Sequence, residues 1–341
     1  MKELKFICAQ PDDNYYVWQV HLWMESLKKL GMSDKAIVLV FTPSFREKST
    51  QWEKVVNLYP EAEFVFYKDE ENDVSDKLGV YIPVLRPYCL AKYFKDNPDM
   101  EKHAVLYCDS DVVFTEDFNL DQFINDDVCY LSDTNSYINA SYFDSKIKDV
   151  LPDKLEEYKT HDILNLAASL VGIDRATCEK NNLHSGGAQY LLKNIDASFW
   201  EDVKQHCLYI RIYLQNVNKE FFLDENTGFQ SWCADMWAVL WNLWKREKET
   251  KNIPEMEFAW SSDPIEKLKT CTILHNAGIV GDHSNGYPAF YKGKYHLGKN
   301  PFTDPHLNTV LENEESKKYC THHYLSQLIE LKNKYNLNYN P

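Results

Sequence analysis

The residues best suited to chemistry are Asp109 and Asp111, which flank Ser110 directly after the apolar run Ala-Val-Leu-Tyr-Cys. Side chains two positions apart on a strand project to the same face, so both carboxylates can reach one cation. Carboxylate oxygens are preferred ligands of Mg²⁺ and Mn²⁺. An acidic pair at the end of a buried strand also needs a counter-charge. We therefore predict a divalent-metal site here; a pair that only caps a turn is the alternative.

The elements that must position this pair alternate between short β-branched or aromatic runs and helical patterns over the first 115 residues. This alternation is typical of a largely parallel sheet covered by helices. In such sheets ligands bind beyond the carboxyl ends of the strands, where the acidic pair falls. The patterns predict strands at 5–9, 37–41, 63–67 and 104–107, and helices at 17–30, 45–58 and 86–94.

The remainder of the chain is more irregular. Residues 146–182 are acidic and helical, and we interpret them as an insertion. Periodicity further predicts strands at 188–192 and 271–274 and helices at 197–217 and 228–247. Residues 278–302 are rich in Gly, Asn, Pro, Tyr and Lys, which indicates a long ligand-facing loop. We expect an α/β domain over 1–304 and a helical C-terminal extension over 305–341.

Composition limits the partners and the compartment. The 341 residues carry a formal charge of −15, which opposes nonspecific attraction to nucleic acid. No segment is apolar enough to insert into a membrane. The N-terminus enters a strand without a secretory pattern, and the nine scattered cysteines indicate reduced, buried thiols. We expect a cytoplasmic protein, in the host cytoplasm if viral; the oligomeric state stays open.

The order of these features resembles the Rossmann-like GT-A glycosyltransferases: apolar strand, Asp-x-Asp, Gly-Gly strand, acidic helix and a late strand ending in His275. The resemblance covers about residues 4–302. It is strongest to the retaining family-8-like enzymes and to the peptidyl serine galactosyltransferase and hydroxyproline arabinosyltransferase groups, and the run at 185–190 is similar to stand-alone phage enzymes. It implies transfer of a sugar from a nucleotide diphosphate, UDP being the commonest, with Mn²⁺ or Mg²⁺ and with retention favoured.

The resemblance also implies roles for individual residues. The implied metal ligands are Asp109, Asp111 and His275. The implied nucleotide-sugar contacts are Asp12, Tyr15 as a stacking platform for the base, Arg86, Asp109, Ser110, Gly186, Gly187, Lys294 and Lys299. The implied catalytic or acceptor-side residues are Asp235, Glu225 and Gln189, with Asp224 as an alternative to Asp235. Structural explanations compete for several of them: a salt bridge for Asp235, a tight turn for the glycines, and solvated surface for the lysines.

Two other classes of protein compete with this reading. A nucleotidyltransferase or sugar pyrophosphorylase ordinarily needs a glycine-rich phosphate loop, and residues 8–18 contain no glycine. A non-enzymatic protein that binds Ca²⁺ or carbohydrate is the second alternative. For an enzyme, the acceptor hydroxyl belongs to a glycan, a protein or a hydroxymethylated base of phage DNA, and the sequence leaves this choice open.

Overall fold

The computed structural model describes residues 2–45, 47–70, 81–115, 117–224, 226–278, 286–296 and 298–337. The chain forms two compact units, each built from separate stretches of sequence. Unit 1 comprises Met1–Leu4, Glu71–Tyr107 and Gln122–Ile253; unit 2 comprises Lys5–Glu70, Cys108–Asp121 and Pro254–Pro341. The predicted boundary at residue 304 stays a prediction.

Unit 2 begins with three parallel strands, β1 (Leu4–Pro11), β2 (Ala36–Thr42) and β3 (Glu63–Lys68). Every residue of β2 is buried, as its continuous apolar run predicts for a strand covered on both faces. Two helices make the connections between these strands, α1 (Asn14–Lys29) and α2 (Gln51–Leu58).

A second, three-stranded sheet of unit 2 brings the predicted metal ligands together. It has the order β5 (Val112–Phe114), β10 (Ile273–His275) and β9 (Phe258–Trp260). Strands β5 and β10 are antiparallel, and His275 pairs with Val112. The last residue of β10 therefore lies opposite the first residue of β5, directly beside Asp111.

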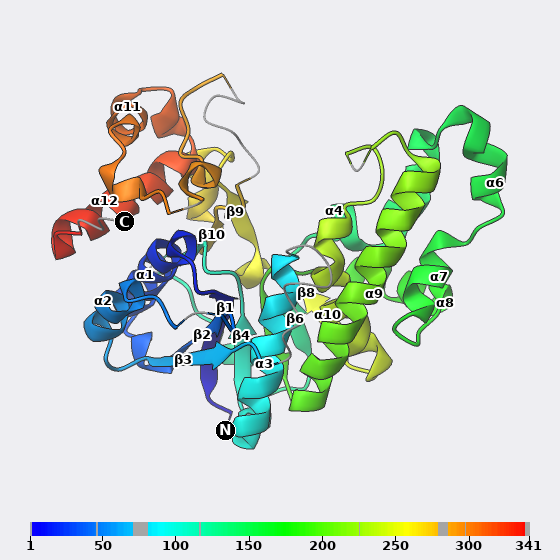
Figure 1. The fold of residues 1–341 in the computed structure, drawn as a ribbon, viewed down its shortest axis with the longest axis horizontal. Coiled ribbons are helices and arrows are strands. Elements are labelled where there is room, and N and C mark those ends of the chain that lie inside the picture. Colours follow the sequence, from blue (N-terminus) through cyan, green and yellow to red (C-terminus); the bar gives the residue numbers. More distant parts are fainter. Residues whose placement is uncertain are drawn as a thin grey trace. The chain divides into compact units, whose positions relative to one another are not determined.

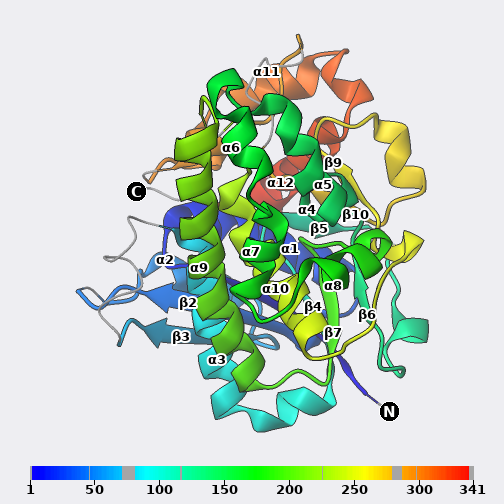
Figure 2. The same cartoon turned by 90° about the vertical axis from the view of Figure 1, so that its right-hand side faces the viewer.

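The chain ends in helices α11 (His306–Glu312) and α12 (Cys320–Tyr335), which lie near each other in orange and red in Figure 2. Helix α12 packs against α1 and against β9. Its inward-facing leucines and Tyr324 are buried, which accounts for the stability of a helix whose sequence is otherwise polar.

Unit 1 contains β4 (Ala104–Tyr107), β7 (Tyr190–Lys193), β6 (Cys129–Leu131) and β8 (Thr250–Asn252). Strand β7 is antiparallel to both β4 and β6, whereas β6 and β8 are parallel. Hydrogen bonding orders these four strands as β4-β7-β6-β8. The predicted α/β class is confirmed.

Three helices of unit 1 pack together, α3 (Leu85–Asp96), α9 (Ala197–Phe221) and α10 (Ala234–Lys245) (Figure 1). Helix α10 is buried at nine positions, including Trp237, Trp241 and Trp244, as its apolar spacing predicts. Within the described ranges, no helix is both long and apolar enough to cross a membrane. All nine cysteines are buried, as expected.

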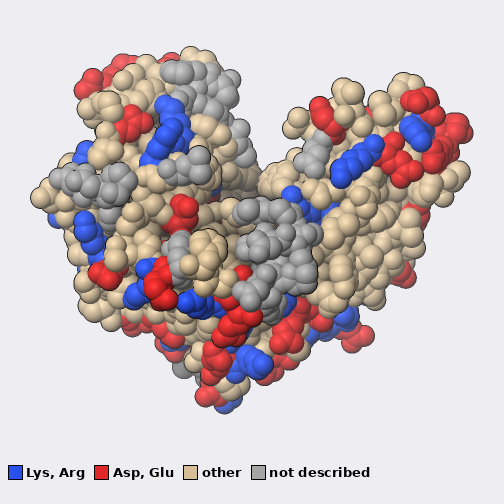
Figure 3. Space-filling model, viewed as in Figure 1, with Lys and Arg blue, Asp and Glu red and all other residues tan. Residues whose placement is uncertain are grey.

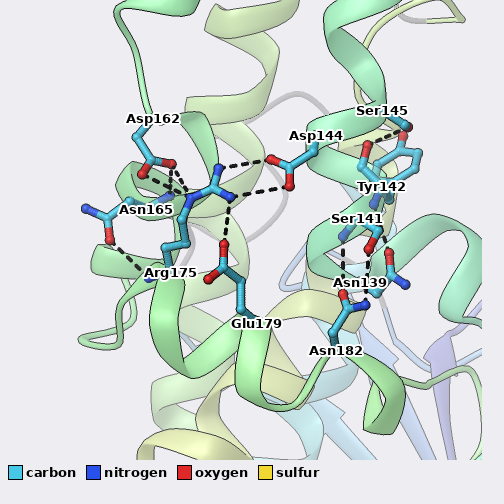
Figure 4. A network of polar contacts seen from close by, with 10 residues as sticks. All are labelled: Asn139, Ser141, Tyr142, Asp144, Ser145, Asp162, Asn165, Arg175, Glu179 and Asn182. Atoms are coloured by element: carbon cyan, nitrogen blue, oxygen red, sulfur yellow. Dashed lines mark hydrogen bonds and ion pairs between the residues drawn. The ribbon is translucent and has the colours of Figure 1, made fainter.

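The predicted insertion is helical, with α4 (Asn135–Ile138) and α5 (Ala140–Ser145) before it and α6 (Leu155–Lys159), α7 (Ile163–Ser169) and α8 (Arg175–Lys180) within it. Arg175 lies between three carboxylates, as Figure 4 shows. Its guanidinium forms ion pairs of 3.0 Å with Asp144, Asp162 and Glu179. One side chain thus ties α5, the start of α7 and α8 together.

Three of the predicted elements begin later than expected for reasons that the structure shows. The strand predicted from 188 begins at Tyr190, because Ala188 has a φ of 67° and breaks the extended conformation. The helix predicted from 45 begins at Gln51, after a loop that bonds to Asp12. The helix predicted from 228 begins at Ala234, because the Asn218 side chain bonds both the N–H and the carbonyl of Phe229.

Candidate functional site

The predicted metal ligands Asp109, Asp111 and His275 converge in unit 2. Each offers one ligand atom, and these atoms all lie within 4.8 Å of one another. His275 Nε2 lies 3.3 Å from Asp111 Oδ1 and 3.8 Å from Asp109 Oδ2. Asp111 and His275 are buried, whereas Asp109 is partly exposed. A ligand can therefore reach the group from the side of Asp109.

Lys292 is a fourth charged residue at this site, and the sequence did not single it out. Its ammonium forms an ion pair with Asp111 Oδ2. Burial alone would raise the pKa of Asp111, but the neighbouring Lys292 and His275 hold it well below its ordinary value. Asp111 is thus kept ionised, which is the form that binds a cation.

Gly278 makes room for the Lys292 side chain. Its φ of +73° belongs to the left-handed region, and an added Cβ would lie 2.8 Å from Lys292 Cε. Only glycine combines this conformation with such a close approach. Gly278, three residues after His275, therefore leaves room for the Lys292 side chain that reaches Asp111.

The donor set fits a divalent cation. Two carboxylates and an imidazole suit Mn²⁺, whose ligands include oxygen and nitrogen. Asp111 Oδ1 and both polar side-chain atoms of Asn276 are buried and form no well-aligned hydrogen bond among the described residues; their polar neighbours are His275 Nε2, 3.3 Å from Asp111 Oδ1, and the Tyr324 hydroxyl beside Asn276. The Asn276 N–H donates to the Asp111 carbonyl at 3.1 Å, which fixes the end of β10 against the acidic triplet. A cation and its water ligands would satisfy these buried atoms.

Two predicted phosphate-binding lysines line one cavity of unit 2. The cavity has a volume of about 610 Å³, and Lys294, Lys299, Tyr295 and Asp304 are among its lining residues. The Asp304 carboxylate accepts hydrogen bonds from the Tyr295 hydroxyl at 2.8 Å and from the His306 N–H at 2.8 Å. The structure therefore brings the two lysines to one place, where their charges can act on the same anion.

Three other predicted nucleotide contacts lie in buried surroundings of unit 2. The Asp12 carboxylate accepts hydrogen bonds of 2.9 Å from the Ser49 N–H and the Trp52 indole. The ring of Tyr15 stacks on His296, with ring centroids 3.9 Å apart. Ser110 is buried between the two acidic residues. Asp12 thus has a structural role, and the His296 imidazole covers one face of the Tyr15 ring.

The Gly-Gly segment of unit 1 is held against β6. An added Cβ at Gly186 would lie 2.4 Å from the Ser132 carbonyl oxygen, so this position requires glycine. The Gly187 N–H donates to the same carbonyl at 3.0 Å. Gln189 is fully buried, and its side-chain oxygen accepts a hydrogen bond of 2.7 Å from the Ser132 hydroxyl. Ser132 thus holds both ends of the segment.

Arg86 and Asp235, predicted to have separate roles, form an ion pair of 3.3 Å within unit 1. The Tyr81 hydroxyl donates to the Trp232 carbonyl at 2.9 Å and accepts from the Asp235 N–H at 3.3 Å. Burial, followed by the charge of Asp235, raises the pKa of Tyr81 well above its ordinary value, so the phenol stays neutral. Glu225 lies outside the described residues.

Comparisons with known proteins give structural likenesses only. No protein-family model matches the chain, and no curated protein matches it. It is similar to the galactosyltransferase LgtC, solved with donor and acceptor sugar analogues, with 12% identity, a TM-score of 0.46, and coverage of 99% of this chain and 97% of that one. It is also similar to mouse xyloside xylosyltransferase 1, with 11% identity, a TM-score of 0.36, and coverage of 81% and 98%.

A third similar structure is the mannosyltransferase PcManGT from Pyrobaculum calidifontis, solved with GDP-Man and Mn²⁺. Its identity is 9% and its TM-score 0.29, with coverage of 98% of this chain and 88% of that one.

Proposed function

We propose that the protein is a metal-dependent glycosyltransferase that transfers a sugar from a nucleotide-diphosphate donor to an acceptor hydroxyl. The observation that carries this proposal is the convergence on one point of Asp109 and Asp111, from the turn before β5, and His275, from the end of β10. The sequence motif predicted Asp109 and Asp111, and the family resemblance implied His275. The buried polar atoms around these residues support an ion at the same place.

Asp109, Asp111 and His275 would hold the cation. A bound divalent cation supplies Lewis-acid stabilisation of the negative charge that develops on a departing diphosphate. Lys292, beside Asp111, and the cavity lysines Lys294 and Lys299 add positive charge within the same unit. Charges fixed in advance stabilise such a leaving group without reorganising during the reaction.

The reaction breaks the bond between the sugar C1 and the diphosphate oxygen and forms a bond between C1 and the acceptor oxygen. The acceptor hydroxyl loses its proton in the same overall change. We assign nucleotide contacts to Arg86, donor-sugar contacts to Gly186 and Gly187, and acceptor-side roles to Gln189, Asp235 and Glu225. Retention of configuration is the stereochemistry that we favour, because the sequence resembles the retaining family-8-like enzymes most strongly.

We favour UDP as the nucleotide and a hydroxyl of a glycan or a protein as the acceptor. A hydroxymethylated base of phage DNA is the less favoured acceptor. On the face drawn in Figure 3, basic side chains are scattered among acidic ones rather than gathered into one basic band, as far as the described residues show. Together with the charge of −15, this distribution opposes binding of a polyanion.

The test is a mass-spectrometric screen of nucleotide sugars for Mn²⁺-dependent hydrolysis and transfer. We expect turnover of at least one UDP-sugar, which chelation of the metal, Asp111→Asn and His275→Ala each abolish. Asp99→Asn, a change of an exposed surface carboxylate, is the matched control and should leave turnover intact. Normal turnover by the Asp111 and His275 variants would refute the site assignment.

Two additional assays, one with a sugar phosphate and a nucleoside triphosphate and one with hydroxymethylated DNA as acceptor, separate the alternatives. Release of pyrophosphate from a sugar phosphate and a nucleoside triphosphate would identify a nucleotidyltransferase instead. Transfer to hydroxymethylated DNA would identify that acceptor, and its absence across the donor panel would exclude it.

A further inference from the structure

Helix α12 holds the segment that carries Lys292 to the metal ligands. We name residues 286–296 the Lys292 segment. At its centre, the Phe290 N–H donates a buried hydrogen bond of 2.9 Å to Thr321 Oγ1 of α12. The Phe290 ring also stacks on Tyr324 of α12, with centroids 5.6 Å apart. Thr321 and Tyr324 are both buried.

The turn before α12 holds the beginning of the same segment. The Ser316 hydroxyl donates to the Pro288 carbonyl at 2.5 Å. The rings of Tyr287 and Tyr319 are stacked, with centroids 4.1 Å apart and planes within 8° of parallel. Two hydrogen bonds and two ring contacts therefore hold residues 287–290, just before Lys292, against the N-terminal end of α12.

Helix α12 can serve as a fixed support because both of its ends are anchored in unit 2. At its start, the Cys320 N–H donates to the Asp263 carbonyl at 2.9 Å and the Thr321 N–H to the Ser261 carbonyl at 2.7 Å. At its end, the Tyr335 hydroxyl donates to the buried Glu25 carboxylate of α1 at 2.9 Å, and Lys334 forms an ion pair with the same carboxylate.

We propose that α12 is a positioning element of the donor site, and that Thr321 is a positioning residue which sets the place of the Lys292 ammonium beside Asp111. This inference rests on the proposed function. It also predicts a specific energetic effect of Lys292. A fixed positive charge beside Asp111 opposes a bare divalent cation, because like charges repel, and favours a cation that arrives with a diphosphate.

The test measures two affinities for each variant: that of Mn²⁺ alone, by electron paramagnetic resonance, and that of UDP at saturating Mn²⁺, by calorimetry. Lys292→Met should tighten binding of bare Mn²⁺ and weaken binding of UDP, each about fivefold, the size of a partly screened charge interaction. Thr321→Val, which keeps the shape but removes the hydroxyl, should shift both affinities in the same two directions by about twofold.

Thr321→Ser keeps the hydroxyl that accepts from the Phe290 N–H, so this variant should match the wild type in both measurements. In the Lys292→Met background, Thr321→Val should have no further effect, because the hydroxyl acts through the lysine. Ser316→Ala is the second probe, chosen in case Thr321→Val does not fold, and should give the same opposed shifts.

A general loosening of the site would weaken both affinities, and an irrelevant contact would change neither. Either result overturns the assignment of α12, as does an additive effect in the Lys292→Met background. Failure of the proposed function gives a different result. If Asp111→Asn leaves Mn²⁺ binding unchanged, the metal site itself is wrong, whatever the α12 variants do.

Discussion

The pair Gly186 and Gly187 offers a comparison of two adjacent residues with different surroundings. At Gly186 an added Cβ would lie 2.4 Å from the Ser132 carbonyl oxygen and 2.7 Å from Leu131 Cβ, both in or beside β6. At Gly187 it would lie 2.5 Å from the Tyr190 hydroxyl and 2.8 Å from Met236 Cε, which are the ends of side chains. Side-chain ends can move, whereas β6 cannot shift without disturbing the sheet.

The expected cost of each alanine follows from these contacts. Overpacking costs about 1–3 kcal/mol, and the Gly187 N–H bond to Ser132, lost if the segment moves away, about 1 kcal/mol more. We therefore expect Gly186→Ala to lower the free energy of unfolding by about 2–4 kcal/mol. Gly187→Ala should cost less, about 1–2 kcal/mol, because Met236 can change rotamer and only the ring of Tyr190, which is stacked on Tyr107, has to shift.

Urea denaturation of both variants, followed by tryptophan fluorescence, measures the difference. If Gly187 also approaches the donor sugar, Gly187→Ala should lower kcat/KM far more than its small loss of stability explains. The reasoning fails if Gly186→Ala lies within about 0.5 kcal/mol of the wild type, or if Gly187→Ala is the more damaging of the two.

Three further predictions concern other parts of the chain. Arg175→Met should lower stability by about 1–2 kcal/mol and speed proteolysis within 146–182, with Arg175→Lys intermediate because it keeps the charge but not the planar geometry; equal protease resistance would contradict this. Asp235→Asn should lower kcat about a hundredfold if the carboxylate acts on a substrate. A purely structural pair would instead give Asp235→Asn and Arg86→Met the same stability loss of about 1 kcal/mol with kcat unchanged. Burial lowers the pKa of His21 to about 4. As the pH falls below about 6.5, His21 is protonated in the unfolded chain but stays neutral in the folded chain, so the free energy of unfolding should drop by up to about 3 kcal/mol near pH 4. His21→Leu should flatten that pH dependence, and an unchanged slope would count against it.

The sequence predicted two of the metal ligands from a local signal, because Asp109 and Asp111 follow an apolar strand at a spacing of two. His275, which ends another apolar run, was implied as a ligand only by the family resemblance. Antiparallel pairing of β5 with β10 brings the three together, as the family resemblance implied. The spacing of the acidic pair is a local signal, so it can be read without knowledge of distant contacts.

Lys292 could not be found in the same way. Three lysines occur within eight residues, at 292, 294 and 299, and their sequence surroundings are alike. The contact of Lys292 with Asp111 depends on Gly278 and on the support from α12, both of which are tertiary features. The ion pair of Arg86 with Asp235 could not be predicted from the sequence either, because the two residues lie 149 positions apart.

Element boundaries were missed where a side chain bonds the backbone of a distant residue. The Asn218 amide keeps Phe229 out of the helix that the apolar spacing predicts from residue 228. Ala188 adopts a positive φ that no sequence rule assigns to alanine. Propensity and periodicity describe neighbours along the chain, so they do not register such contacts.

Thermal stabilisation by UDP tests the central claim most directly. The midpoint of unfolding is measured with UDP in the presence of Mn²⁺, of Ca²⁺ or of a chelator. At a UDP concentration about 100 times its dissociation constant, we expect stabilisation of about 2.7 kcal/mol with Mn²⁺, none with the chelator, and none in Asp111→Asn or His275→Ala. Equal stabilisation without metal, or stabilisation by Ca²⁺ alone, would contradict a nucleotide-sugar site built on Asp109, Asp111 and His275.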